Sequence, residues 1–214
     1  MTDIRPIGVL RSCFGQKFGI PRQAGLVPAA EAVLELDPTR VTPDAVRGLD
    51  AFSHVWIVFV FHAAEGVKMV VRPPRLGGGR KVGVLATRAP HRPNNIGLSA
   101  VRLLGVEGLS VRLGGGDFLD GTPVLDVKPY LPYADALPDA TAGWAGGALP
   151  RVPVRVAAEV TLPPDLLEVV VQSLSLDPRQ AGARGGSYAM RVGPFDVHAV
   201  YADGAWEVVR VVEV

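Results

Sequence analysis

Residues 52–61, FSHVWIVFVF, constrain the possible fold more than any other part of this sequence. Valine and aromatic residues dominate the segment, and such side chains favour β-strands over helices. Both alternating sets of positions are apolar, so the strand must be covered on both sides or must line a closed barrel. The segment therefore predicts a β-structure with an enclosed interior.

Further segments with a β-like pattern follow one another with hardly a helical pattern between them. The expected strands before residue 139 cover residues 4–10, 32–36, 52–61, 82–86, 98–106, 109–113 and 122–127. The alternation of strand and helix that is typical of a Rossmann fold is missing. We therefore expect a mainly β protein whose N-terminal domain, residues 1–139, is an antiparallel β-barrel.

The C-terminal third predicts a second, smaller domain. Residues 140–150 are rich in glycine and alanine and form a plausible linker. In residues 151–214, an amphipathic helix is expected at 163–173, where two prolines and Asp165 mark its start. Strands are expected at 188–192, 195–201 and 206–212, the last two joined by an Asp-Gly turn. The second domain is therefore α+β.

Composition narrows the functional classes. With 214 residues, of which 48% are hydrophobic, the chain can bury a core of its own. The longest apolar run, residues 55–61, is too short to span a membrane as a helix, and the formal net charge of +1 gives no global attraction to nucleic acid. Cys13 is the single cysteine, and the first residues lack a signal-peptide pattern, so we expect a cytoplasmic protein.

Residues 81–99, KVGVLATRAPHRPNNIGLS, combine a strand pattern with an unusually polar loop. The loop carries Arg88, His91, Arg92 and two asparagines, and its prolines stiffen the backbone. A stiff loop can present guanidinium, imidazole and amide groups at fixed positions. The alternative interpretation is a solvated turn, although an ordinary connection needs fewer donors.

Three other segments carry candidate chemistry. Residues 11–25 interleave phenylalanine with basic residues, which suits stacking on a base or binding an anion, unless Phe14 and Phe18 only pin the loop to the core. Residues 63–81 form a positively charged flap that suits phosphates, unless its charges are merely solvated. Residues 114–135 gather several aspartates, Lys128 and two tyrosines around a strand.

His54 and His62 flank the central strand without a partner at metal-ligand spacing, so no metal site is expected.

Several long motifs resemble one family. They are IPRQAG, FSHVWIVFVFH, VRPPRLGGGRKVGVLATRAPHRPNNIGLSAVRL, DFLDGTPVLDVKPYLPYAD, SLDPRQ and YAMRVGPFDV. They are similar to the TsaA-like tRNA N6-threonylcarbamoyladenosine methyltransferases, with Asn95 at a position where the family usually has proline. The resemblance implies a β-barrel that binds S-adenosylmethionine, a small C-terminal α+β module and a homodimer. It also implies methylation of N6 on the hypermodified adenosine 37, beside the anticodon of threonine tRNA.

The resemblance also assigns a cofactor pocket, residue by residue. Its members are Pro21, Arg22, Gln23, His62, Arg88 and Leu98, with the backbone of Phe118, Leu119, Asp120 and Gly121. These residue types suit the ligand, because an arginine can bind the methionine carboxylate and an apolar wall can cover the adenine. We expect Arg22 or Arg88 to bind that carboxylate.

The remaining roles are hypotheses about the reaction. The N6 proton of adenine becomes acidic only as the methyl group arrives, so a weak base suffices, and Asp120 is the candidate, with Tyr130 and Lys128 orienting it. Arg92 is the candidate that binds the carboxylate of the threonylcarbamoyl group. The flap residues expected to contact the tRNA backbone are Arg72, Arg75, Arg80 and Lys81.

Two other classes of function stay open from the sequence. A β-barrel with basic loops could be an RNA-binding module without chemistry, and a barrel with a polar pocket could bind a nucleoside ligand without modifying it. Binding of S-adenosylmethionine separates these classes, since a module that binds RNA alone does not bind the cofactor.

Overall fold

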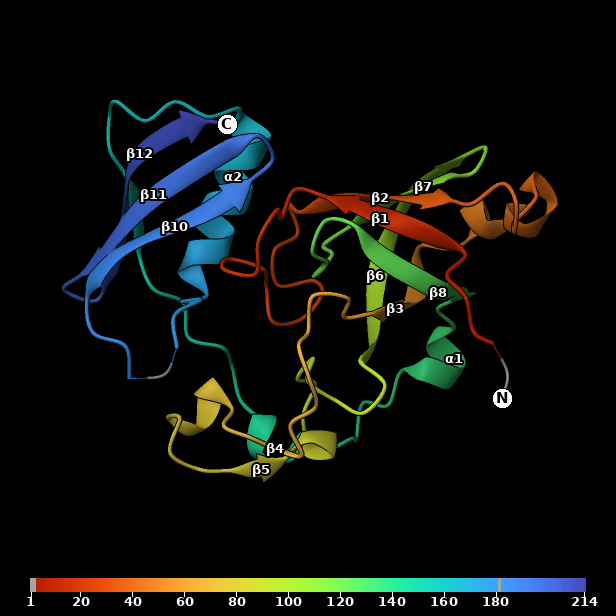
Figure 1. The fold of residues 1–214 in the computed structure, drawn as a ribbon, viewed down its shortest axis with the longest axis horizontal. Helices are drawn as coiled ribbons and strands as arrows, with labels where there is room; N and C mark the ends of the chain where they lie inside the picture. Colours follow the sequence, from red (N-terminus) through yellow and green to blue (C-terminus); the bar gives the residue numbers. More distant parts are fainter. Residues whose placement is uncertain (1–2, 181) are drawn as a thin grey trace.

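The computed structural model describes residues 3–180 and 182–214, and two β-sheets dominate it (Figure 1). The strands of the first sheet are β1 (Gly8–Ser12), β2 (Glu31–Leu36), β3 (His54–Val60), β6 (Ile96–Glu107), β7 (Ser110–Gly114) and β8 (Thr122–Pro129). Those of the second are β9 (Val154–Val156), β10 (Gly186–Val192), β11 (Phe195–Ala202) and β12 (Ala205–Glu213). The short strands β4 (Val70–Val71) and β5 (Val82–Gly83) pair with each other, and the α-helices are α1 (Pro132–Asp135) and α2 (Pro164–Ser175).

The first sheet closes into a barrel with the strand order β1-β2-β7-β6-β3-β8, and every pair of neighbours is antiparallel. This confirms the expected fold class. β3 pairs with β6 on one side and with β8 on the other, and its inward side chains Val55, Ile57 and Phe59 are at most 2% exposed. Trp56 on the outer face donates from Nε1 to Oδ2 of Asp135 in α1 at 2.9 Å. The cover from α1 explains why this strand is apolar on both faces.

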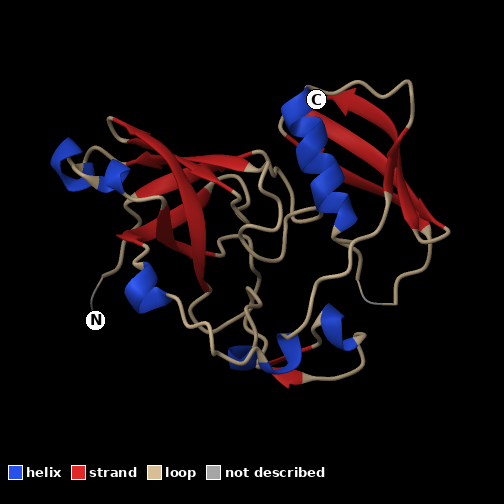
Figure 2. Cartoon of the chain, turned by 180° about the vertical axis from the view of Figure 1, so that it is seen from behind, coloured by secondary structure: helices blue, strands red, loops and turns tan. Residues whose placement is uncertain are grey.

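The second sheet has the order β10-β11-β12-β9, and α2 lies across one of its faces (Figure 2). β9 pairs parallel to β12, whereas the other neighbours are antiparallel. The buried side of α2 contributes Val169, Val170 and Leu174, each at most 2% exposed. The C-terminal part is thus α+β, as the sequence predicts.

The core of the second sheet also contains residues from the loop between β1 and β2. Phe14 and Val27, at most 1% exposed, pack in the same cluster as Trp206. Phe14 also forms a β-bridge with Val192, and Phe18 stacks on Tyr188 with ring centroids 5.4 Å apart. The two phenylalanines therefore pin this loop to the core, which is one of the two interpretations that the sequence left open, and neither side chain is exposed for stacking on a base. The domain limits 1–139, 140–150 and 151–214 stay a prediction.

One expected strand, residues 82–86, is mostly absent. The chain leaves β5 after Gly83 and forms a 3-10 helix at Val84–Ala86. The turn buries Val84 at 2% exposure and leaves Leu85 76% exposed, a pattern that alternation along a strand also produces.

No helix among residues 3–180 and 182–214 has the length and apolar character needed to cross a membrane.

Candidate cofactor and tRNA site

The segments that carry the predicted cofactor residues meet at one end of the barrel. In the register of the strands, Leu10 near the end of β1 pairs with Thr122 at the start of β8. Val60 at the end of β3 pairs with Ile96 at the start of β6. The loops that follow β1 and β3 therefore lie beside the loops that precede β6 and β8. Pro21–Gln23, His62, Arg88 and residues 118–121 belong to these loops.

The backbone of residues 118–121 is fixed against the end of β1. The amide of Asp120 donates to the carbonyl of Phe14, and that of Gly121 to the carbonyl of Leu10, both at 2.9 Å. The Ser12 hydroxyl donates to the Phe118 carbonyl at 2.7 Å, and the Ser12 amide donates to Oδ1 of Asp120 at 3.0 Å. The segment is therefore held in place before any ligand binds.

Arg88, in the loop before β6, contacts the loop after β1. Its Nη1 donates to Oε1 of Gln23. The hydroxyl of Ser99, a buried residue of β6, donates to Oδ1 of Asp117 at 2.7 Å. Burial raises the pKa of Asp117, and the Ser99 hydrogen bond and Arg88 oppose that shift. A guanidinium group is thus held at the end of the barrel, where a ligand carboxylate could bind.

Arg22 points to the C-terminal part of the chain. Its Nη2 donates to the carbonyl oxygens of Asp177 and Arg179, both at 3.1 Å. Burial of its guanidinium lowers the pKa of Arg22, and the negative charge of Asp177 opposes this. Arg179 forms an ion pair with Asp177 at 2.7 Å, and its guanidinium carbon lies 3.2 Å from the centroid of the Tyr201 ring. Of the two arginines expected to bind the cofactor carboxylate, Arg22 therefore joins the SLDPRQ segment, and Arg88 is the better candidate.

His62 and Leu98 complete the predicted pocket at this end. His62 Nδ1 lies 3.5 Å from the hydroxyl oxygen of Thr122, and the His62 side chain is exposed. Leu98 is 53% exposed on the outer face of β6, next to Ile96 at 37%. An arginine held by Gln23 and exposed aliphatic side chains nearby match the carboxylate and the adenine of S-adenosylmethionine, so the residues present fit the cofactor.

Two of the predicted catalytic residues lie elsewhere in the chain. Lys128 pairs in register with Trp56, and the amide of Tyr130 donates to the His54 carbonyl, at the opposite end of β3 from His62. Eight residues of extended strand separate Tyr130 from Thr122, which is roughly 26 Å at 3.3 Å per residue. Lys128 is paired with Asp126 at 2.9 Å. Within one chain, Lys128 and Tyr130 therefore do not orient Asp120, because a long strand separates groups that are close in sequence.

The predicted tRNA-contacting residues of the flap have different surroundings. Arg75 donates to the carbonyl oxygens of Ala145, Gly146 and Gly147 at 2.6 to 2.9 Å, and so ties the flap to the predicted linker. Arg72, Arg80 and Lys81 are exposed. The last three side chains are therefore better placed than Arg75 to meet an RNA backbone.

The loop with the predicted substrate selector is braced from within. Arg92 is half-buried and donates from Nη1 to the Thr87 carbonyl at 3.2 Å. Asn95 has φ 50° and donates from Nδ2 to the Pro90 carbonyl at 2.7 Å. Proline cannot adopt that φ, so this backbone suits the asparagine that departs from the family pattern. The bracing contact of Arg92 is present, and its role toward substrate stays a prediction.

Sequence reasoning gave no role to the pair Ser99 and Asp117. A signal was present, because Ser99 is a polar residue at a position of β6 that faces the barrel interior, two residues after Gly97 and two before Val101. A polar side chain facing an apolar core needs a hydrogen-bond partner. The partner is 18 residues away in sequence, and only the barrel closure brings it near.

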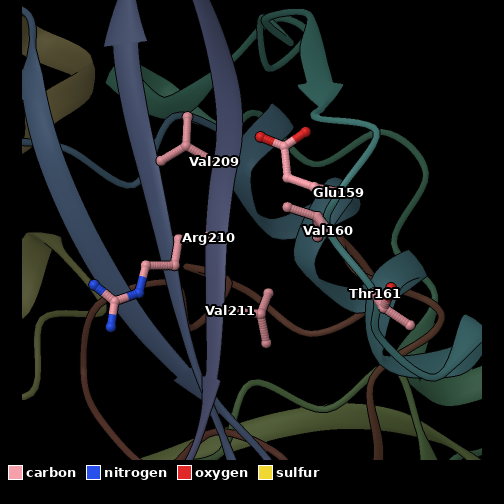
Figure 3. A pocket seen from close by; sticks show the side chains of 6 residues that line it. All are labelled: Glu159, Val160, Thr161, Val209, Arg210 and Val211. Atoms are coloured by element: carbon pink, nitrogen blue, oxygen red, sulfur yellow. The ribbon is translucent and has the colours of Figure 1, made fainter.

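The C-terminal sheet has a shallow recess away from this site. It has a volume of about 250 Å³ and lies between residues 159–161 and β12. In Figure 3 the Glu159 carboxylate and the Arg210 guanidinium point in different directions, and valine side chains make up much of the lining. The recess therefore offers no convergent polar groups for catalysis.

Among the described residues no cluster of His, Cys, Asp and Glu could hold a metal ion.

Comparison with known proteins agrees with this geometry. Residues 9–136 match the model of the tRNA-methyltransferase O N-terminal domain. The chain is 44% identical over 221 residues to a tRNA (adenine(37)-N6)-methyltransferase of Escherichia coli, covering 94% of each chain. It is 46% identical over 213 residues to a Pseudomonas aeruginosa protein named as a candidate S-adenosylmethionine-dependent methyltransferase, RcsF, covering 93% of this chain and 92% of that one.

The fold comparison extends over the whole chain. The crystal structure of TrmO from Pseudomonas aeruginosa superposes with a TM-score of 0.83 at 41% identity and covers 99% of each chain. The C-terminal sheet is thus part of the shared architecture. The chain belongs to the tRNA-methyltransferase O family, and it is an S-adenosylmethionine-dependent tRNA methyltransferase.

Proposed function

We propose that this protein methylates N6 of adenosine 37 in tRNA, and that its substrate is the N6-threonylcarbamoyl form of that adenosine in threonine tRNA. The matched relative from Escherichia coli is named for the adenine-37 reaction, and this chain covers 94% of it. The observation that carries the proposal is the meeting of Gln23, Arg88 and Leu98 at one end of the barrel. A tRNA-modifying enzyme works where tRNA is, so we place it in the cytoplasm.

S-adenosylmethionine supplies an activated methyl group, so the chain mainly has to align donor and acceptor. We assign Arg88 to the methionine carboxylate, with Gln23 holding the guanidinium. Leu98 provides an apolar wall for the adenine, and the fixed backbone of residues 118–121 closes the pocket. Asp120 is exposed, and its Oδ1 accepts a hydrogen bond from the Ser12 amide. Its other carboxylate oxygen, Oδ2, is the proposed proton acceptor.

The tRNA is proposed to lie across the flap, with Arg72, Arg80 and Lys81 against its backbone.

The site is also proposed to lie near the interface of a homodimer. Several large apolar side chains on the flap, in the 3-10 helix at Val84–Ala86 and at the start of β6 are exposed, and burying them in a second copy would remove them from water. They are Val67, Met69, Val70, Leu85, Ile96 and Leu98.

Titration with S-adenosylmethionine tests the first part of the proposal. Heat of binding is expected for the purified protein, and its absence would favour the alternative of an RNA-binding module without chemistry.

Methylation assays on threonine tRNA, with and without the threonylcarbamoyl group, test the second part of the proposal. The modified tRNA should react much faster, because a site built to pair a carboxylate rejects a substrate that lacks one. Equal rates on both tRNAs would rule out the threonylcarbamoyl group as the determinant.

Arg92 is the proposed partner of that carboxylate. Arg92→Lys keeps the charge and loses the planar fork, so turnover on modified tRNA should fall while cofactor affinity stays unchanged. The matched control is Arg102→Lys. Arg102 is exposed and pairs in register with His54 at the start of β3, the end of that strand opposite His62, so this substitution should be neutral.

A further inference from the structure

We propose that His91 is a positioning residue that fixes the flap, residues 63–81, in place for tRNA. The inference rests on the proposed function, since it assumes that the charged side chains of the flap contact the tRNA backbone. It goes beyond that function, because His91 belongs neither to the proposed cofactor pocket nor to the proposed tRNA contacts.

His91 makes two hydrogen bonds to the root of the flap. Its Nδ1 lies 3.0 Å from the carbonyl oxygen of Glu65, and because a carbonyl can only accept, Nδ1 is the donor. The amide of Lys68 donates to the His91 carbonyl, also at 3.0 Å. In many β-turns the first carbonyl and the fourth amide bond to each other, whereas here both groups bond to His91. The path of residues 65–68 therefore depends on His91.

The loop around His91 is braced by its own hydrogen bonds. The Pro90 carbonyl accepts from the Arg92 amide at 2.9 Å and from Asn95 Nδ2 at 2.7 Å. The amide of Phe61, directly after β3, donates to the Asn95 carbonyl at 2.8 Å, which ties this loop to the barrel. The barrel therefore holds the loop of His91, and His91 in turn holds the root of the flap.

The position of the root carries over to the cations of the flap through the β4–β5 ribbon. Val71 of β4 lies opposite Val82 of β5. Arg72 follows Val71 and Lys81 precedes Val82, so both exposed cations leave the same end of the ribbon. A two-stranded ribbon is marginally stable by itself, and Figure 1 shows this one outside both main sheets. A support just before β4 therefore decides where these cations lie.

The same support sets the flap against the loop of the two predicted ligand-binding arginines. Arg88 lies three residues before His91, and Arg92 directly follows it. The proposed cofactor contact, the proposed substrate contact and the support of the flap thus share one braced loop. A flap that swings at its root must be ordered when tRNA binds, and this cost weakens binding.

The test compares His91→Phe with His91→Asn. Phenylalanine keeps a ring and removes the donor, whereas the asparagine amide nitrogen is as many bonds from Cβ as Nδ1 and can still donate to the Glu65 carbonyl. The Michaelis constant for tRNA should rise about five- to tenfold in His91→Phe, the effect of losing one hydrogen bond, and stay near wild type in His91→Asn. In both variants, kcat at saturating tRNA and the affinity for S-adenosylmethionine should stay unchanged.

Two further readouts separate positioning from general damage to the fold. The salt dependence of the Michaelis constant should become flatter in His91→Phe, because fewer flap cations then displace counterions from the tRNA. Trypsin should cut faster after Arg80 and Lys81, because a mobile segment is cleaved more readily. The thermal midpoint should change little, since His91 is only half-buried.

His54→Phe is the matched control. His54 lies at the opposite end of β3 from Phe61, and its Nδ1 hydrogen-bonds to the hydroxyl of the neighbouring Ser53 at 2.9 Å. This variant loses the same side-chain groups away from the flap, so its Michaelis constant for tRNA and its trypsin cleavage should match those of the wild type.

The outcomes separate this inference from the proposed function. If Arg72→Ala and Lys81→Ala leave the Michaelis constant for tRNA unchanged, the proposed contact between flap and tRNA is itself wrong. If those variants raise it and His91→Phe does not, the positioning role is wrong and the proposed function stands. The role is also wrong if His91→Asn is as impaired as His91→Phe, or if thermal midpoint and cofactor affinity fall together with tRNA binding.

His91→Gln takes the place of His91→Phe if the latter does not fold. The glutamine amide lies one bond farther from the backbone than the asparagine amide, so His91→Gln should lose the contact with Glu65 and raise the Michaelis constant for tRNA. Equal Michaelis constants for His91→Gln and His91→Asn would overturn the inference.

Discussion

Gly97 lies on the inner face of β6, where the chain passes close to the ring of Phe59. A Cβ atom at this position would come within 2.2 to 2.7 Å of the ring carbons. Phe59 is 2% exposed and packs edge-on against Phe61 and Phe118, with ring centroids 5.0 and 5.1 Å apart, so it has little room to move. Gly97→Ala should therefore destabilise the fold by about 1 to 3 kcal/mol, as overpacking of a core does.

Gly105 on the same strand is the matched control for this substitution. No atom lies within 4 Å of a Cβ built at Gly105, so Gly105→Ala should leave the thermal midpoint nearly unchanged. Chemical denaturation of both variants measures the difference in the free energy of unfolding. Equal stability of the two variants would show that the Phe59 ring can shift without cost.

The two arginines of the predicted cofactor pocket should differ in effect. Arg88→Ala is expected to weaken S-adenosylmethionine binding by tens of fold, because the guanidinium no longer makes its charge-assisted contact with the methionine carboxylate. The thermal midpoint should change little, because the Arg88 side chain is exposed. Arg22→Ala should instead lower the thermal midpoint, because Asp177 and Arg179 lose a donor to their carbonyl oxygens. Titration and thermal unfolding of both variants check this. The opposite pattern would assign Arg22 to the ligand and Arg88 to structure.

The sequence names candidate residues for the site, and the structure brings only some of them together. Arg88, Gln23 and His62 come to one end of the barrel, as the motifs imply. Lys128 and Tyr130 were grouped with Asp120 because they are near it in sequence, but β8 carries them to the far end. Asp117 and Ser99 could not be paired from sequence, because their contact depends on how the strands close.

At the scale of elements, Arg75 links the flap to residues 140–150. Its guanidinium donates to three consecutive carbonyl oxygens of that segment, and Trp144 Nε1 donates to the Ala86 carbonyl at 3.0 Å. Arg75→Ala removes these hydrogen bonds, so both segments should become more mobile. Limited proteolysis should then cut the chain within residues 140–150 faster than in the wild type.

The flap arginine Arg72 is the control for this effect. Arg72→Ala removes an exposed charge from the same flap and should leave the cleavage rate unchanged, while weakening tRNA binding at low salt. If Arg75→Ala raises the Michaelis constant for tRNA and leaves cleavage unchanged, Arg75 contacts RNA as the flap pattern first suggested.

At the scale of the whole molecule, the loop between β1 and β2 of the barrel contributes side chains to the core of the C-terminal sheet. The sequence predicts most strands of both sheets from their apolar patterns, but it predicts no strand at β9, and the expected strand at 82–86 is mostly absent. It does not predict that the loop between β1 and β2 enters the second core, because glycines and a proline break every periodicity in residues 15–25. Phe14 follows β1 of the first sheet by two residues but packs in the core of the second, where Gly193 also donates its amide to the Cys13 carbonyl at 2.7 Å.

Because the loop between β1 and β2 packs in the second core, we expect the molecule to unfold as one cooperative unit. Phe14→Ala removes a side chain that is 1% exposed in the second core, and Leu34→Ala removes one that is fully buried in the barrel. Phe14→Ala should cost about 3 to 5 kcal/mol and Leu34→Ala about 2 to 5 kcal/mol, the ranges for such buried side chains replaced by alanine. In differential scanning calorimetry, the wild type should show a single transition, and both variants should move that same transition to lower temperature. Two transitions, with Phe14→Ala shifting one and Leu34→Ala the other, would show that the sheets unfold separately, and the loop between β1 and β2 would then be a local contact that does not couple them.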